Sequence, residues 1–157
     1  MLSRVADTLY WMSRFVERAE GVTRLVEIHR DTDLESDARS GDFGYWHSTL
    51  QSMCAKEQFE EDEMQGPDAF LLFSSQWNNS VINSINSARE NARMVRDQLS
   101  EEIWVELNSL YHFLNSNNAI FEYQNDESSF FRSIISFSLV FQGLSDAMIH
   151  HDEGWRF

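Results

Sequence analysis

Proline occurs only once in the 157 residues, at Pro67, and glycine only six times. Both residues interrupt regular backbone structure, so their scarcity leaves long stretches that can form helix. Strand signals are missing, because no Asn-Gly or Asp-Gly turn separates two runs of alternating apolar and polar residues. The sequence therefore predicts an all-α protein, a helical bundle of the up-down type with about five or six helices.

The first helix is predicted over residues 2–30. Apolar residues recur there at intervals of three and four, which places them on one face of a helix. Tyr10, Trp11 and Phe15 widen the apolar surface beyond that face, so we expect this helix to pack on more than one side. The apolar face consists of Leu2, Val5, Leu9, Met12, Val16, Ala19, Val22 and Val26.

The boundaries of the other helices follow from local signals. Pro67 predicts a helix start, because its missing N–H needs no partner in the first turn. The polar run 78–80 and Ser100 each supply a cap for a following helix. Helices are thus predicted over residues 43–59, over 67–75, from the 78–80 caps to about residue 99, over 100–114 and over 126–150, with loops at 31–42 and 115–125.

Charge excludes some partners. The formal net charge is −14, so the phosphate backbones of nucleic acids and anionic membranes would repel the chain. The single cysteine, Cys54, excludes an internal disulfide and lies among acidic residues that disfavour a reactive thiolate. No apolar run is long enough to span a membrane, and we expect a cytoplasmic protein.

The first helix carries one set of candidate functional residues. Arg14, Glu17, Arg18 and Gly21 lie three or four residues apart and therefore share a face. Glu17 can form an ion pair with Arg14 within the helix. Arg18 then remains to contact another helix, or a carboxylate or phosphate of a ligand.

A second set lies on the fourth predicted helix. Arg89, Arg93 and Arg96 form a stripe beside Glu90, and Asp97 lies one turn from Arg93. We expect the two stripes to face each other and to form a polar layer inside an apolar bundle. That layer is either a set of interhelical salt bridges that defines the helix register, or an anion-binding pocket. Spacing alone does not separate these two interpretations.

Metal and cofactor chemistry has little support in the sequence. The tail 150–153 holds four possible ligands, but consecutive helical residues point in different directions. Metal-binding bundles use Glu-x-x-His pairs, and the sequence contains none. There is also no glycine-rich phosphate loop, no nucleophile elbow and no zinc-type spacing. We expect no metal site and no cofactor.

Three segments in order resemble the alpha-E family, a bacterial all-α domain with a Glu-Arg motif. Residues 2–20, which contain Glu17-Arg18, look like the family's start. Residues 88–97, followed by Ser100, Trp104 and Asn108, resemble its central signature, and residues 152–157 resemble a third motif. The resemblance covers nearly the whole chain and implies a single alpha-E-like helical domain over residues 1–157.

Members of this family are typically about twice as long, and their third motif opens a repeat of the Glu-Arg helix. The resemblance therefore implies that this chain corresponds to the N-terminal half. We expect the bundle to be completed by dimerisation or by a separately encoded second half. Alpha-E proteins are encoded beside ATP-grasp proteins and transglutaminase-like proteins, so the resemblance implies a role in amide-bond formation or peptide modification.

Three functions remain open on the sequence. The first is an accessory module that contacts an ATP-grasp-type ligase or its peptide substrate. The second is an enzyme or ligand-binding domain in which Glu17 or Glu90 acts as a general base near an arginine-bound carboxylate. The third is a purely structural oligomerisation domain. The sequence assigns no catalytic role to any residue.

Overall fold

The computed structural model describes residues 2–35, 44–64 and 66–151. The described residues form eight α-helices and one short 3-10 turn, η1, without a strand, which confirms the all-α prediction. In chain order the elements are α1 (Leu2–Glu35), α2 (Gly44–Ser52), α3 (Lys56–Glu61), α4 (Pro67–Phe73), α5 (Val81–Met94), η1 (Arg96–Gln98), α6 (Glu101–Leu114), α7 (Ala119–Asn125) and α8 (Glu127–His151).

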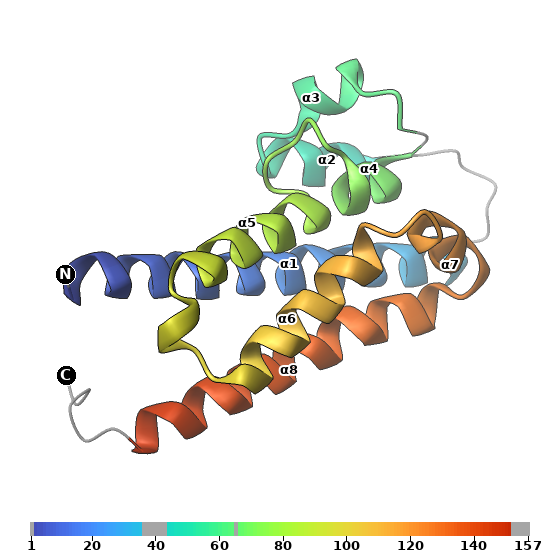
Figure 1. The fold of residues 1–157 in the computed structure, drawn as a ribbon. Coiled ribbons are helices and arrows are strands. Elements are labelled where there is room, and N and C mark those ends of the chain that lie inside the picture. Colours follow the sequence, from blue (N-terminus) through green and yellow to red (C-terminus); the bar gives the residue numbers. More distant parts are fainter. Residues whose placement is uncertain (1, 36–43, 65, 152–157) are drawn as a thin grey trace.

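Four of these helices form the bundle. Helix α1 packs against α5 and α8, and α6 packs against the same two helices, so α1 and α6 lie opposite each other. Figure 1 shows α4 above one end of α1 and α5, with α2 and α3 beside it, and α7 at the turn between α6 and α8. The apolar side chains inside this ring of four helices form the core.

The apolar face predicted for the first helix is the buried face of α1. Its central residues have almost no exposed surface. Tyr10 and Trp11 differ from the prediction, because 57% and 44% of their surface stays exposed although α1 packs against α4, α5 and α8. The buried residues of the face are Met12, Val16, Ala19, Val22 and Val26.

The predicted caps begin the helices where expected. The Ser80 side chain accepts a hydrogen bond from the Asn83 N–H at the start of α5, and Ser100 accepts one from the Ile103 N–H at the start of α6. Pro67 is the first residue of α4. These starts were predictable because a cap acts on groups within its own first turn.

The second predicted helix, 43–59, is interrupted. Helix α2 ends at Ser52 and α3 begins at Lys56. Between them, Cys54 has a φ of 52°, and the Ala55 N–H donates to the Leu50 carbonyl over 2.8 Å. Ala55 is fully buried at this bend, so packing interrupts a segment whose composition favours helix.

Two predicted loops are shorter than expected. Residues 31–35 continue α1, and the rest of that loop, 36–42, lies outside the described residues. The predicted loop 115–125 contains α7, in which Ala119 and Tyr123 are buried. The many polar residues in this segment favoured a loop, so the sequence did not indicate that these two residues are buried in a helix. The predicted tail of the fourth helix, after Met94, turns into η1.

Helix α8 corresponds to the last predicted helix, and its phenylalanine side chains are buried. Leu139 and Val140 instead lie on its outer face and are exposed. The buried hydrophobic residues of α8 are Phe130, Phe131, Ile134, Phe137 and Phe141. One strong apolar stripe on α8 thus faces the core, and additional apolar residues remain at the surface.

Candidate functional site

Helices α5 and α6 bring together arginine and aromatic side chains on one face of the bundle. The stripe of arginines on α5 and η1 borders α6, whose Trp104, Asn108 and Tyr111 lie three and four residues apart and share a side of that helix. We define the arginine–aromatic face as Arg89, Arg93, Arg96, Trp104 and Tyr111. Ring contacts of Arg89 join α5 to α6, and a ring contact of Arg96 joins η1 to α6.

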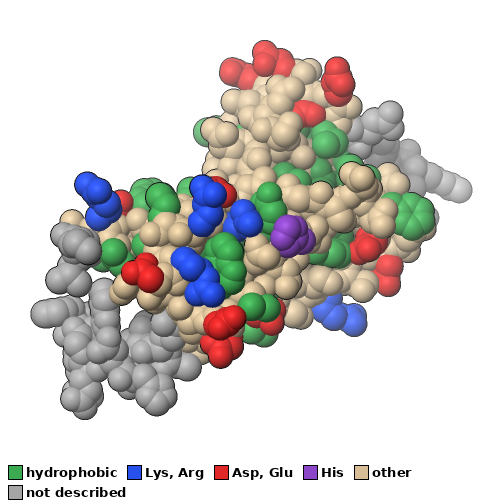
Figure 2. Space-filling model, in the orientation of Figure 1, with side chains coloured by type: hydrophobic (Ala, Val, Ile, Leu, Met, Phe, Trp, Pro, Cys, Tyr) green, Lys and Arg blue, Asp and Glu red, His purple; other side chains and the backbone are tan. Residues whose placement is uncertain are grey.

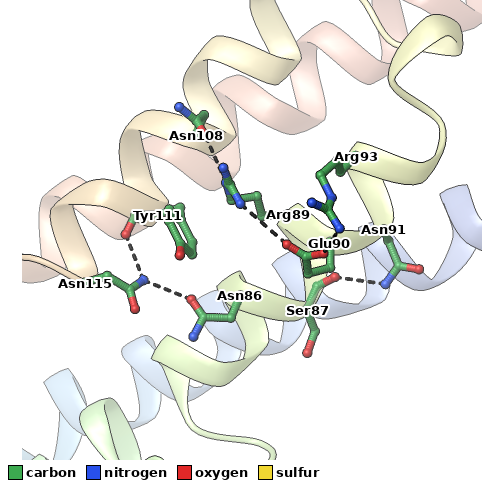
Figure 3. Close-up of polar contacts among 9 residues, drawn as sticks. All are labelled: Asn86, Ser87, Arg89, Glu90, Asn91, Arg93, Asn108, Tyr111 and Asn115. Carbon is green, nitrogen blue, oxygen red and sulfur yellow. Dashed lines mark hydrogen bonds and ion pairs between the residues drawn. The ribbon is translucent and has the colours of Figure 1, made fainter.

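Arg89 is the most constrained residue of this face. Its Nε donates to Oδ1 of Asn108 over 2.8 Å, and its guanidinium carbon lies 4.2 Å from the Tyr111 ring centroid (Figure 3). The Trp104 ring centroid is 5.7 Å away. Only 21% of the Arg89 side chain is exposed. These contacts hold the guanidinium in one orientation.

The other two arginines are held less tightly. Arg93 is 67% exposed and pairs with Glu90 of its own helix over 3.1 Å. Glu90 also lies 3.5 Å from Arg89, so one carboxylate serves two arginines (Figure 3). Arg96 of η1 lies with its guanidinium carbon 5.3 Å from the Trp104 ring centroid. The face therefore carries more positive than negative charge.

An amide pair connects the far end of the same two helices. Asn115, which follows α6, donates from its side-chain amide to Oδ1 of Asn86 on α5 over 2.9 Å, and the same amide donates to the Tyr111 carbonyl (Figure 3). Together with Arg89 and Asn108, this pair fixes the separation of α5 and α6. The face is thus supported at two levels along the helices.

Charge distinguishes this face from the protein as a whole. The chain has a net charge of −14, yet arginine side chains gather beside hydrophobic ones over α5 (Figure 2), while Glu101 and Glu102 lie in the first turn of α6. Arginine and aromatic residues are enriched among the residues that dominate binding energy at protein interfaces. Chemically, the face can bind carboxylates or phosphates through the arginines and apolar groups through the rings.

The candidates on α1 do not join this face. Arg14 pairs with Glu17 over 2.5 Å, as predicted within the helix, and both side chains are 52% exposed. Arg18 lies over the ring of Phe15 at 5.3 Å. The predicted interior layer is therefore wrong, since no ion pair joins α1 to α5 within residues 2–35, 44–64 and 66–151.

The reason is the residue type at the contact between α1 and α5. The buried sides of these helices carry small residues, Ala19 on α1 and Ser84, Ala88 and Ala92 on α5. Small side chains let helices approach closely, and arginines do not fit between them. Asp97, the remaining predicted candidate, is exposed in η1 and accepts a hydrogen bond from Gln98.

A junction that sequence analysis missed joins four helices. Arg30 of α1 donates two hydrogen bonds to Glu127 of α8 and lies 3.8 Å from Asp68 of α4. Tyr123 of α7 donates to Oδ2 of Asp68 over 2.6 Å. Burial, with this hydrogen bond, raises the pKa of Tyr123 well above its ordinary value. The hydrogen bonds to Glu127 raise the pKa of Arg30, so both groups keep their protons.

A second missed set joins α1 to α8. Glu20 accepts hydrogen bonds from Ser138, from Gln142 over 3.2 Å and from Arg24 over 2.9 Å. Burial raises the pKa of Glu20, but these hydrogen bonds outweigh burial, and the pKa lies below its ordinary value. Only the Arg24 contact has a local sequence signal, the spacing of four residues.

The structure offers no metal-binding cluster and no membrane span in the described part of the chain. No group of three or more His, Cys, Asp or Glu side chains there is arranged to hold an ion. His29 shares a hydrogen bond of 2.8 Å with Thr49. The side chains of the tail 150–153 lie outside the described residues. None of the described helices has the length and hydrophobicity needed to cross a bilayer.

Comparison with known families shows to which protein family this chain belongs. A family model for alpha-E, a predicted alpha-helical domain with a conserved ER motif, matches residues 1–157. The chain belongs to the alpha-E family. Glu17-Arg18 is the one Glu-Arg dipeptide in this alpha-E sequence, and it lies on α1 beside the Phe15 ring. No curated protein and no solved structure matches the chain.

Proposed function

We propose that this alpha-E protein is an accessory binding module that contacts an ATP-grasp-type ligase through the arginine–aromatic face. The observation that carries the proposal is Arg89, a guanidinium held by Asn108 and Tyr111 at the surface of a strongly acidic chain. A preoriented arginine loses little entropy on binding a carboxylate. The partner surface is therefore acidic.

We choose the ligase as the partner because alpha-E proteins are encoded beside ATP-grasp proteins. In this proposal the ATP-grasp partner forms the amide bond and the module positions that enzyme or its peptide substrate. A transglutaminase-like protein is a further candidate partner in the same process. ATP-dependent ligation also implies a cytoplasmic location. These roles require no catalytic group on the alpha-E chain.

The geometry supports binding better than catalysis. Glu17 and Glu90, the two candidate bases, are each more than half exposed and paired with arginines of their own helices. A general base works best in a cleft that excludes water and holds the substrate. A cavity lined by residues of α6, α7 and α8 and by Asp126 contains neither Glu17 nor Glu90.

Binding of a purified ATP-grasp-type ligase to the alpha-E chain tests the proposal. Arg93→Glu reverses an exposed charge on the face, and Arg132→Glu reverses an exposed arginine on α8 as the matched control. We expect Arg93→Glu to weaken binding about 10-fold or more, and Arg132→Glu to change it less than about 2-fold. Equal effects of both variants, or no effect of either, would contradict the proposal.

A catalytic role is tested separately. The double variant Glu17→Gln, Glu90→Gln removes both candidate bases without changing the fold, because both residues lie at the surface. In a reaction reconstituted with the ligase, we expect the double variant to support full product formation. Loss of product with unchanged ligase binding would favour the enzyme alternative over the accessory role.

Exposed apolar side chains on α1 and α8 favour assembly with a second chain. Tyr10, Trp11, Leu139 and Val140 remain uncovered. We propose that a second copy, or a separately encoded second half, covers part of this surface. Analytical ultracentrifugation at micromolar concentration tests the homodimer. A well-folded monomer that also fails to bind a second-half protein would exclude this assembly.

A further inference from the structure

A cavity of about 260 Å³ lies where the end of α6 meets α7 and the start of α8. Phenylalanine rings form its apolar part. Phe130 is buried, and Phe113 lies against it with ring centroids 5.6 Å apart. Phe121 of α7 stands at the rim and is 65% exposed. An exposed phenylalanine beside a recess offers a ring face to an incoming group.

The polar groups of this cavity are mainly hydrogen-bond acceptors. Glu122 and Asp126 bring two carboxylates to its lining. Oδ1 of Asp126 accepts a hydrogen bond from the Ser129 N–H over 3.0 Å. The Asp126 carboxylate therefore already compensates the partial positive charge at the N-terminus of α8. The Asn125 amide nitrogen donates to the Phe121 carbonyl, which leaves its side-chain oxygen as an acceptor.

Aromatic faces and carboxylates together select one ligand class. A guanidinium or ammonium group is attracted by ring faces and donates hydrogen bonds to carboxylates, whereas an anion is repelled by both. Figure 2 shows acidic and hydrophobic side chains adjoining at the end of the molecule where Figure 1 places α7. We propose that this cavity binds an organic cation that carries a guanidinium or alkylammonium group.

The volume restricts the size of that cation. Pockets for drug-sized ligands measure roughly 300–1,000 Å³, so this cavity is slightly smaller than that range. It accepts a group the size of an arginine or lysine side chain and not a nucleotide. The cation comes either from a basic side chain of a peptide or from a free small amine. This site is separate from the arginine–aromatic face, and its existence does not depend on the proposed function.

Titration of the full chain with small probes tests the site. We use the acetylated, amidated tripeptide Gly-Arg-Gly and the free amine agmatine, with Gly-norleucine-Gly and Gly-Glu-Gly as apolar and acidic controls, and record amide chemical shifts. We expect saturable shifts at Phe121, Asn125 and Ser129 with both cationic probes and none with the controls. Tighter binding of the tripeptide assigns a peptide side chain as the ligand, and tighter binding of agmatine assigns a small amine.

Variants separate the cavity from general attraction to an acidic protein. Phe121→Leu keeps an apolar residue but removes the ring, and Glu122→Gln removes one charge. Each is expected to weaken the cationic probe about 5-fold or more. The matched controls, Ile120→Ala on α7 and Glu106→Gln on α6, are exposed outside the cavity and should leave binding unchanged.

Three results would overturn the proposal. The norleucine tripeptide could bind as well as the arginine one, which would show a purely apolar recess. Cation-induced shifts could spread over the whole surface and weaken equally in Glu106→Gln, which would show unspecific attraction. The cationic probes could also give no saturable shift. Because Phe121 and Glu122 are exposed, their variants should keep the wild-type melting temperature.

Discussion

Arg30 of α1 donates two hydrogen bonds to the carboxylate of Glu127, the first residue of α8, although the two residues lie 97 positions apart in the chain. Asp68 of α4 lies 3.8 Å from the same guanidinium and accepts the Tyr123 hydroxyl of α7. One arginine therefore ties together elements from the beginning, the middle and the end of the sequence. This junction closes the end of the bundle at which α7 lies (Figure 1).

Arg30→Lys should destabilise the protein, because lysine keeps the charge but cannot form the two-pronged contact with Glu127. We expect the free energy of unfolding to fall by about 2 kcal/mol, measured by urea denaturation. Arg14→Lys is the control, since Arg14 and Glu17 form an exposed pair within one helix, and its effect should stay below about 0.5 kcal/mol. Equal losses in both variants would show that the junction adds nothing.

Glu20→Gln should change how stability depends on pH. The pKa of Glu20 is lowered from 4.5 in the folded protein, so its stabilising effect is present above pH 4.5 and is lost as the pH falls through the folded-state pKa. At pH ~7 we expect wild type to exceed Glu20→Gln in stability by about 1 kcal/mol.

Urea unfolding between about pH 7 and pH 3 measures the difference in stability between wild type and Glu20→Gln. The gap should shrink below pH 4.5, where the unfolded chain takes up the proton first. Glu106→Gln, an exposed change on α6, serves as the control and should leave the pH profile as it is in wild type. A wild-type advantage that stays constant down to the lowest pH would contradict the assigned role of Glu20.

Arg89 and Arg93 should differ in their contribution to stability although they lie one turn apart on α5. Arg89→Ala loses the Asn108 hydrogen bond and two ring contacts, and we expect a loss of about 1–2 kcal/mol. Arg93→Ala loses one exposed pair, with an expected effect below about 0.5 kcal/mol. Thermal unfolding of both variants measures the difference, and indistinguishable melting temperatures would show that Arg89 is not held as described.

Local signals predicted most helix starts and one buried face. Ser80 and Ser100 cap α5 and α6 through N–H groups three residues away, and the buried face of α1 depends only on helical periodicity. Such signals act within one or two turns and are therefore visible in the sequence. The Arg14–Glu17 pair was predictable for the same reason.

Features that depend on packing were not predictable. The bend at Cys54 forms because Ala55 is buried there, and α7 is helical because Tyr123 packs against α8 and bonds to Asp68. The arginine stripes on α1 and α5 were expected to meet. Alanine and serine at the helix contact bring the two backbones close, which keeps the arginines at the surface.

The sequence by itself determined that the chain is helical, where several helices begin, which side of α1 is buried and to which family the chain belongs. Only the tertiary structure decided that Arg89 meets Asn108 and Tyr111, and that Arg30 meets Glu127. The physical reason is range. Caps and periodicity act between neighbours along the chain, whereas the partner of a long charged side chain depends on the spacing and angle at which whole helices pack.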